Sequence, residues 1–110
     1  MTKEEMENWL EEKISFLPKR TSGEAGYEYI IKEIQKVFPH ERKSLVLVLK
    51  DWLKLRKEPL TMLATEIAEK YHLNELIDDI RSLLKDVEEG KVFKAFYTKF
   101  IRKSLLKLKK

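Results

Sequence analysis

Two residues near the middle of the chain have the spacing of a metal-binding pair. Glu69 and His72 stand three positions apart, which places two ligands on one helical face, as in carboxylate-bridged di-iron bundles. That chemistry needs a second such pair and two further inward glutamates. The other histidine is His40, and the other expected helices carry no inward carboxylates. We therefore expect Glu69 and His72 to form a solvated helix end, and we expect neither a metal nor a cofactor.

A second group of ionisable residues forms an acidic stripe along one expected helix. Its members are Glu75, Asp78, Asp79, Asp86 and Glu89. Paired carboxylates act as acid and base only where burial shifts their pKa values apart. Because the stripe lies opposite the apolar face of its helix, we interpret it as an exposed, solubilising face. A docking strip for a basic partner is the alternative.

The rest of the sequence offers no catalytic motif. There is no cysteine, which excludes disulfides, thiolate nucleophiles and sulfur-ligated metal sites. The three glycines, Gly23, Gly26 and Gly90, lack the spacing of a phosphate-binding loop, and no nucleophile motif is recognisable. The sequence therefore predicts that the protein is not an enzyme.

The C-terminal end of the chain is basic. The last twenty residues contain no acidic residue, and their cations are Lys91, Lys94, Lys99, Arg102, Lys103, Lys107, Lys109 and Lys110. Aromatic residues lie among them: Phe93, Phe96, Tyr97 and Phe100. Basic residues interleaved with rings can follow a phosphate backbone and stack bases. These rings have the spacing of one inward stripe, so we expect them in the core and the lysines in water.

Composition indicates one soluble domain over residues 1–110. The chain has 110 residues, of which 43% are hydrophobic and 38% charged, so it is long enough to bury a core of its own. Its formal net charge is +4 and its pI is near 9.2. The acidic N-terminal segment has no apolar core of a secretory signal, and no apolar run is long enough for a membrane span. We expect a cytoplasmic protein with no membrane contact.

Hydrophobic periodicity predicts six helices, because apolar residues recur at helical spacing and no stretch alternates between polar and apolar. The first covers about residues 3–17, the third about 40–56 and the last about 91–110. Two pairs have capping-box spacing: Thr2 with Glu5, and Thr21 with Glu24, where Ser22 is an equally good cap. Three prolines mark helix boundaries: Pro18, Pro39 and Pro59. Asn74 is expected to cap the fifth helix and Gly90 to end it in the left-handed conformation.

Helices of similar length joined by short turns predict three antiparallel hairpins. Each hairpin has roughly 35 residues, the size of helical repeats, in which stacking of neighbours makes the core. The fold is therefore expected to be all-α. It is either a right-handed superhelix of stacked hairpins or a closed six-helix bundle.

A set of residues from Leu45 to the C-terminus carries a family resemblance. Its members are Asp51, Trp52, Leu53, Leu60, Ala64, Ala68, Leu73, Glu75, Leu76, Ile80, Leu83, Leu84, Gly90, Lys91, Phe93 and Tyr97. This region resembles the HEAT-type helical repeats of small bacterial proteins, in particular those of the toxin-immunity kind. The resemblance implies a HEAT-like superhelix and a bacterial protein that neutralises a toxin by binding it. Since immunity proteins against nucleases are usually acidic, a pI near 9.2 argues against a nuclease as the toxin.

Some apolar residues lie outside the apolar arcs of their helices. Tyr29 and Met62 point away from those arcs, and Leu47 and Leu106 do likewise. In a right-handed solenoid, Tyr29 and Met62 would meet beside the basic residues of the last helix. Aromatic and methionine side chains are favoured at interfaces. We therefore expect a partner-binding surface made of Tyr29, Met62, Lys99, Lys103 and Lys107.

The sequence thus predicts a non-catalytic protein–protein interaction module, with toxin neutralisation as the form that the resemblance implies. The alternative is a nucleic-acid-binding protein that uses the basic last helix. Its affinity would fall steeply with salt, because phosphates released from lysines regain their counterions.

Overall fold

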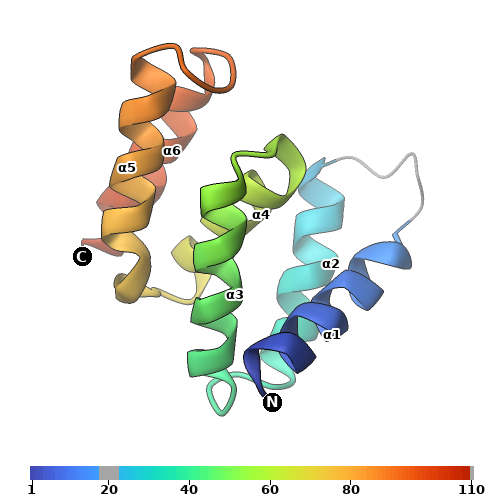
Figure 1. The fold of residues 1–110 in the computed structure, drawn as a ribbon. Coiled ribbons are helices and arrows are strands. Elements are labelled where there is room, and N and C mark those ends of the chain that lie inside the picture. Colours follow the sequence, from blue (N-terminus) through green and yellow to red (C-terminus); the bar gives the residue numbers. More distant parts are fainter. Residues whose placement is uncertain (18–22, 110) are drawn as a thin grey trace. The chain divides into compact units, whose positions relative to one another are not determined.

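The computed structural model describes residues 1–17 and 23–109, and within these residues it is entirely helices, turns and short connections, without a β-strand. The helices are α1 (Lys3–Ser15), α2 (Gly23–Gln35), α3 (Arg42–Leu55), α4 (Glu58–Lys70), α5 (Ile77–Glu88), α6 (Tyr97–Leu108) and the short 3-10 helix η1 (Asn74–Leu76) (Figure 1). The predicted all-α fold is confirmed.

The chain divides into two compact units, Met1–Val48 and Leu49–Lys110. In the first unit, α1 contacts α2. In the second unit, α6 contacts both α5 and α4. Figure 1 shows α5 and α6 side by side and antiparallel, joined by a loop at one end. The pairs α1–α2 and α5–α6 are thus the first and third of the predicted hairpins, and the boundary between the units falls within α3.

Several predicted helix boundaries are confirmed. At the start of α1, Glu5 N donates to Thr2 Oγ1 at 3.1 Å and Thr2 N donates to Glu5 Oε1 at 2.9 Å, which completes the capping box. Pro59 lies in the first turn of α4, and Gly90 has a φ of 75°, in the left-handed region. The boundaries expected at Pro18, Thr21 and Ser22 lie outside the described residues.

The expected beginning of the fifth helix is wrong. Asn74 does not cap it with its side chain; instead Asn74 begins η1, and α5 starts at Ile77. The residues around this turn explain the difference, since Leu73 and Leu76 are both fully buried. A tight turn that buries two leucines replaces the simpler capped start.

The expected beginning of the last helix is also wrong. α6 begins at Tyr97, and the preceding residues 91–96 form turns and bends. Gly90 and Phe93 both have left-handed backbone, with φ values of 75° and 56°. Because a right-handed helix cannot continue through such residues, the connection stays irregular until Tyr97.

Buried apolar side chains form the core within each unit. In the first unit the fully buried ones include Met6, Leu10, Ile30, Ile34 and Val48. In the second unit they include Leu49, Leu53, Ile67, Ala68, Leu73, Leu76, Ile80, Leu83 and Ile101. Removing these side chains from water is the main favourable contribution to folding, and it fixes which face of each helix points inward.

A buried threonine connects the end of α3 to the start of α4. Thr61 Oγ1 donates to the carbonyl oxygen of Trp52 at 2.8 Å and accepts from Lys57 N at 3.0 Å. Both bonds use backbone groups that helix ends leave without partners. The buried Thr61 hydroxyl therefore supplies a hydrogen-bond partner to one backbone group at each of the two helix ends.

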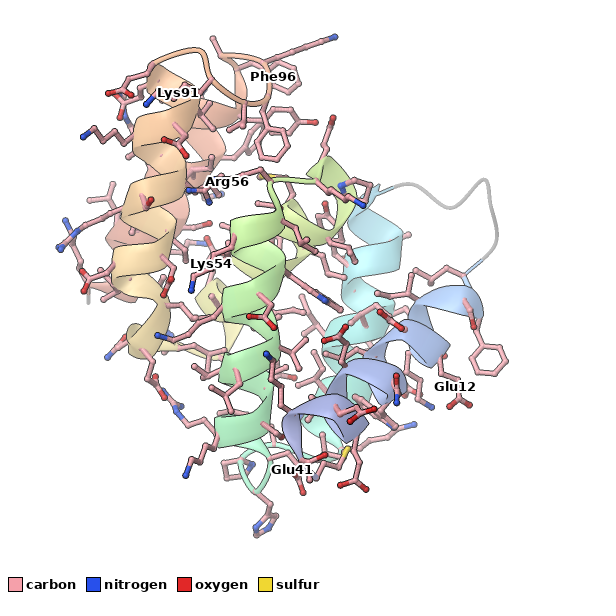
Figure 2. The ribbon with its side chains drawn as sticks, viewed as in Figure 1. Glu12, Glu41, Lys54, Arg56, Lys91 and Phe96 are labelled. Atoms are coloured by element: carbon pink, nitrogen blue, oxygen red, sulfur yellow. The ribbon has the colours of Figure 1, made fainter. Side chains whose placement is uncertain are left out.

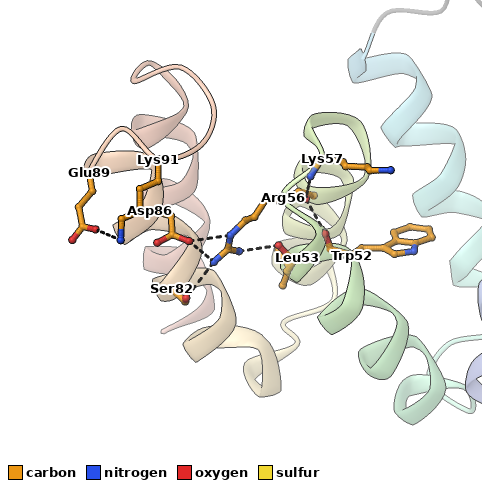
Figure 3. Close-up of polar contacts among 9 residues, drawn as sticks. Trp52, Leu53, Arg56, Lys57, Ser82, Asp86, Glu89 and Lys91 are labelled. Atoms are coloured by element: carbon orange, nitrogen blue, oxygen red, sulfur yellow. Dashed lines mark hydrogen bonds and ion pairs between the residues drawn. The ribbon is translucent and has the colours of Figure 1, made fainter.

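Arg56 connects the end of α3 to α5 (Figure 3). Its Nη1 donates to the carbonyl oxygen of Leu53 at 2.8 Å, while Nε and Nη2 donate to Asp86 Oδ2 at 3.2 and 3.0 Å. Nη2 also donates to Ser82 Oγ at 3.2 Å. The φ of Arg56 is 53°, a left-handed conformation that costs roughly 1–2 kcal/mol for a residue other than glycine. The side-chain contacts offset that cost.

The acidic stripe on α5 is largely paired. Asp79 lies 3.7 Å from Lys50 Nζ, and the side chains of Asp79 and Asp86 are only partly exposed. Asp78 pairs with Arg81 at 3.4 Å and Glu89 with Lys91 at 3.0 Å. The expectation of an exposed stripe is therefore wrong at Asp79 and Asp86, which pair with Lys50 and Arg56.

Replacing Arg56 tests how much its side-chain contacts stabilise the fold and how much its left-handed backbone costs. We expect Arg56→Ala to lower the free energy of unfolding by about 1–2 kcal/mol, because Asp86 loses its partner and the last carbonyls of α3 lose a donor. Arg56→Gly loses the same contacts but adopts the left-handed backbone readily, so it should be about 1 kcal/mol more stable than Arg56→Ala. Urea denaturation followed by circular dichroism measures both. Equal stability of the wild type and Arg56→Ala would contradict this role of Arg56.

Candidate functional site

The residues expected to bind a partner are not all exposed. Tyr29, on α2 in the first unit, is half-buried. Met62, on α4 in the second unit, is only 8% exposed, so the expectation that it faces solvent is wrong. The reason is that α4 is buried around most of its circumference, including the polar residues Thr61 and Thr65. Met62 therefore offers a partner almost no surface.

The rotation of α6 differs from the one expected. Its buried stripe consists of Ile101, Ser104, Leu105 and Leu108. Phe96 and Phe100 were expected in the core but are 57% and 53% exposed. The stripe of aliphatic residues with helical spacing occupies the inward face, so the phenylalanines cannot share it. Leu106 is 64% exposed, which confirms that it points away from the core.

These exposed side chains form one surface, the outer face of α6. We define it by Phe96, Lys99, Phe100, Lys103 and Leu106, which are all exposed. An open hollow of about 750 Å³ follows this face and is lined by Ala95, Phe96, Thr98, Lys99, Arg102, Lys103, Leu106 and Lys107. Its lining combines apolar groups with cations, so it suits binding better than acid–base chemistry.

The ring of Phe96 is held at the end of this face. It stacks on Tyr97, with ring centroids 4.3 Å apart and an angle of 27° between the planes. The Tyr97 hydroxyl donates to Glu58 at the start of α4, which fixes the ring on which Phe96 stacks. Figure 2 shows Phe96 near the loop that joins α5 to α6. The exposed ring is thus preorganised by neighbours within its own unit.

The cations along α6 divide into paired and unpaired ones. Arg102 Nη2 lies 2.7 Å from Glu88 on α5, and Lys107 Nζ lies 3.8 Å from Glu69 on α4. Within the described part of the chain, neither Lys99 nor Lys103 forms an ion pair, although the charge of Lys103 affects Glu66. Of the three lysines expected to bind a partner, Lys99 and Lys103 are therefore the available ones, while Lys107 is already engaged.

Two carboxylates of α4 lie close to the basic side of α6. Glu69 is buried and accepts a hydrogen bond from Ser104 Oγ at 3.3 Å, so the expectation of a solvated Glu69 is wrong. Burial raises the pKa of Glu66, and the nearby charge of Glu69 raises it further, whereas Lys103 and Lys107 act in the opposite direction. Burying the charged Glu66 carboxylate therefore costs free energy that the nearby lysines do not fully offset.

Metal-binding geometry is absent from the part of the chain that the structure describes. In residues 1–17 and 23–109, no three or more histidine or acidic side chains gather closely enough to hold an ion. His72 is exposed, whereas Glu69 is buried. The two residues that share metal-ligand spacing therefore have different surroundings.

Comparisons with known proteins leave the resemblance untested. No protein-family model, no curated protein and no solved structure matches the chain. The similarity to HEAT-like immunity proteins therefore stays a prediction. Among the described helices, none has the length and apolarity needed to cross a membrane.

The raised pKa of Glu66 predicts a pH-dependent effect on stability. Because the folded protein holds this proton more tightly than the unfolded chain, the free energy of unfolding falls as pH rises through the folded pKa of Glu66. Glu66→Gln removes this cost, so we expect a higher thermal midpoint than that of the wild type at pH 7.5. The difference should shrink towards pH 4.5, because the fraction of Glu66 that is protonated, and therefore uncharged, grows as pH falls.

The control for this experiment is Glu11→Gln, which removes an exposed charge from α1. Thermal melts of both variants and the wild type at the two pH values give the comparison. A Glu66→Gln midpoint equal to or below that of the wild type at pH 7.5 would show that burial of this carboxylate carries no net cost.

Proposed function

We propose that the protein is a non-catalytic interaction module that binds another protein through the outer face of α6. The observation that carries this proposal is the exposure of Phe96, Phe100 and Leu106 on one helical face. Isolated exposed apolar residues are ordinary, but several on one face form a patch of the kind that marks interaction sites. Aromatic side chains, phenylalanine among them, are also enriched at protein interfaces.

The resemblance to HEAT-like proteins supports one form of this function, neutralisation of a toxin in the bacterial cytoplasm. The partner would then be a toxin other than a nuclease. The charge of the α6 surface supports that restriction, since Lys99 and Lys103 would repel the basic surface of a nuclease that binds nucleic acid.

The proposal predicts that truncating the outer face of α6 weakens partner capture without unfolding the protein. We expect the double substitution of Phe96→Ala and Leu106→Ala to reduce the recovery of a specific partner at least tenfold in quantitative pull-downs from the native cell. Thermal stability should change little, because both side chains are more than half exposed.

The matched control is Leu47→Ala on α3, which truncates another exposed leucine, one that is 41% exposed. It should leave recovery unchanged. If the double variant recovers every specific partner as well as the wild type does, the outer face of α6 is not the binding surface.

Nucleic-acid binding is a second candidate, and one observation favours it. The rings of Phe96 and Phe100 were expected in the core, where bases could not reach them, but both rings are exposed. Together with Lys99 and Lys103 they could stack bases and pair phosphates. Protein binding is better supported because Arg102 and Lys107 are engaged by carboxylates and because Leu106 adds aliphatic surface.

Salt dependence tests the second candidate. Suppose that Lys99 and Lys103 pair two phosphates of a single-stranded oligonucleotide. A plot of the logarithm of affinity against the logarithm of salt concentration should then have a slope of about −1.4. Fluorescence anisotropy with a labelled oligothymidylate between 25 and 200 mM salt measures this slope, and Lys99→Ala should halve it. An absence of binding at 25 mM salt eliminates this function.

A further inference from the structure

The outer face of α6 has the dimensions of a helical docking strip. Phe96, Lys99, Lys103 and Leu106 follow one another at spacings of three, four and three residues. With a rise of 1.5 Å per residue, Phe96 and Leu106 are separated by about 15 Å along the axis. The strip therefore has apolar groups at both ends and two cations between them, over a length of about three helical turns.

The charge of the strip specifies the charge of its occupant. Lys99 and Lys103 form no ion pair within the described residues, and residues 90–109 contain no carboxylate. A partner that covered Phe96 and Leu106 would remove water from these lysines, which is costly unless the partner supplies opposite charge. Complementarity thus requires acidic side chains in the partner, placed between its own apolar contacts.

The surroundings of the strip favour a polypeptide over a phosphate backbone. Glu88 on α5 and Glu69 on α4 neutralise Arg102 and Lys107 at its two edges. Glu66 lies near Lys103 as a further carboxylate. These acidic groups confine the unpaired positive charge of the strip to Lys99 and Lys103, which suits a few acidic side chains better than a continuous chain of phosphates. The spacing of three and four residues also matches the side-chain spacing of another helix.

We infer that the outer face of α6 docks an acidic amphipathic helix of the partner. Aliphatic side chains of that helix would pack on Phe96 and Leu106, and its glutamate or aspartate side chains would pair with Lys99 and Lys103. This inference rests on the proposed function and adds the chemistry of the segment that the partner presents.

A designed peptide tests the inference directly. The probe is a fluorescein-labelled helical peptide of 15 residues with leucines on one face and glutamates beside them at spacings of three and four. Its binding to the 110-residue chain is measured by fluorescence anisotropy at 150 mM salt. We expect saturable binding, at least tenfold tighter than that of a scrambled peptide whose leucines and glutamates share no face. Replacing the glutamates with glutamines should weaken binding at least fivefold.

Protein variants locate the binding site. Leu106→Ala and Lys103→Glu should each weaken peptide binding about tenfold, and a peptide with lysine in place of glutamate should bind Lys103→Glu better than it binds the wild type. Lys99→Glu provides a second charge variant on the same face. Lys85→Glu, at an exposed position of α5, makes the same charge change elsewhere and should leave binding unchanged.

Four results would overturn the inference: no saturable binding of the designed peptide, equal binding of the scrambled peptide, equal effects of Lys85→Glu and Lys103→Glu, or displacement of the peptide by an oligonucleotide at lower concentration.

The proposed function fails separately. If the pull-down depends on Phe96 and Leu106 but the peptide does not bind, the function stands and the helical partner is wrong. If the peptide binds but native partners are captured independently of this face, the proposed function is wrong.

Discussion

The rotation of α6 about its own axis is the constraint on which the candidate site depends. Ile101, Leu105 and Leu108 are buried, and Ser104 between them donates to Glu69 on α4. On a helix with 3.6 residues per turn, burying this stripe necessarily turns Lys99 and Leu106 outward. The packing within the second unit therefore determines which side chains reach a partner, although none of the exposed residues contributes much to the core.

The start of α6 is the other half of that constraint. Left-handed backbone at Gly90 and Phe93 keeps the connection from α5 irregular, so Phe96 comes immediately before the helix instead of lying within its first turns. Stacking on Tyr97 then supports the exposed ring. In this way a loop conformation, a helix boundary and a ring contact together place an aromatic group at one end of a row of lysines.

Local patterns predicted the features that depend on neighbours in sequence. The capping box of Thr2 and Glu5, the left-handed Gly90 and the outward Leu106 are all confirmed, because short-range geometry determines them. Met62 was misjudged because the number of neighbours around α4 is a tertiary property. The exposure of Phe96 and Phe100 was not predicted, because the aromatic residues were assigned to the inward face together with Ile101 and Leu108. The helical spacing of Ser104 and Leu105 with those two residues is the signal that locates the buried stripe.

Electrostatics connects the candidate surface to the interior of its unit. Lys103 faces solvent and yet lies near Glu66, whose pKa is raised by burial in spite of that lysine. A carboxylate supplied by a bound partner at Lys103 would add negative charge near Glu66 and raise its pKa further. Proton uptake by Glu66 and occupation of the outer face of α6 are thus linked thermodynamically within the proposed interface, so each favours the other. Lys103 therefore connects the electrostatics of Glu66 on α4 with those of the outer face of α6.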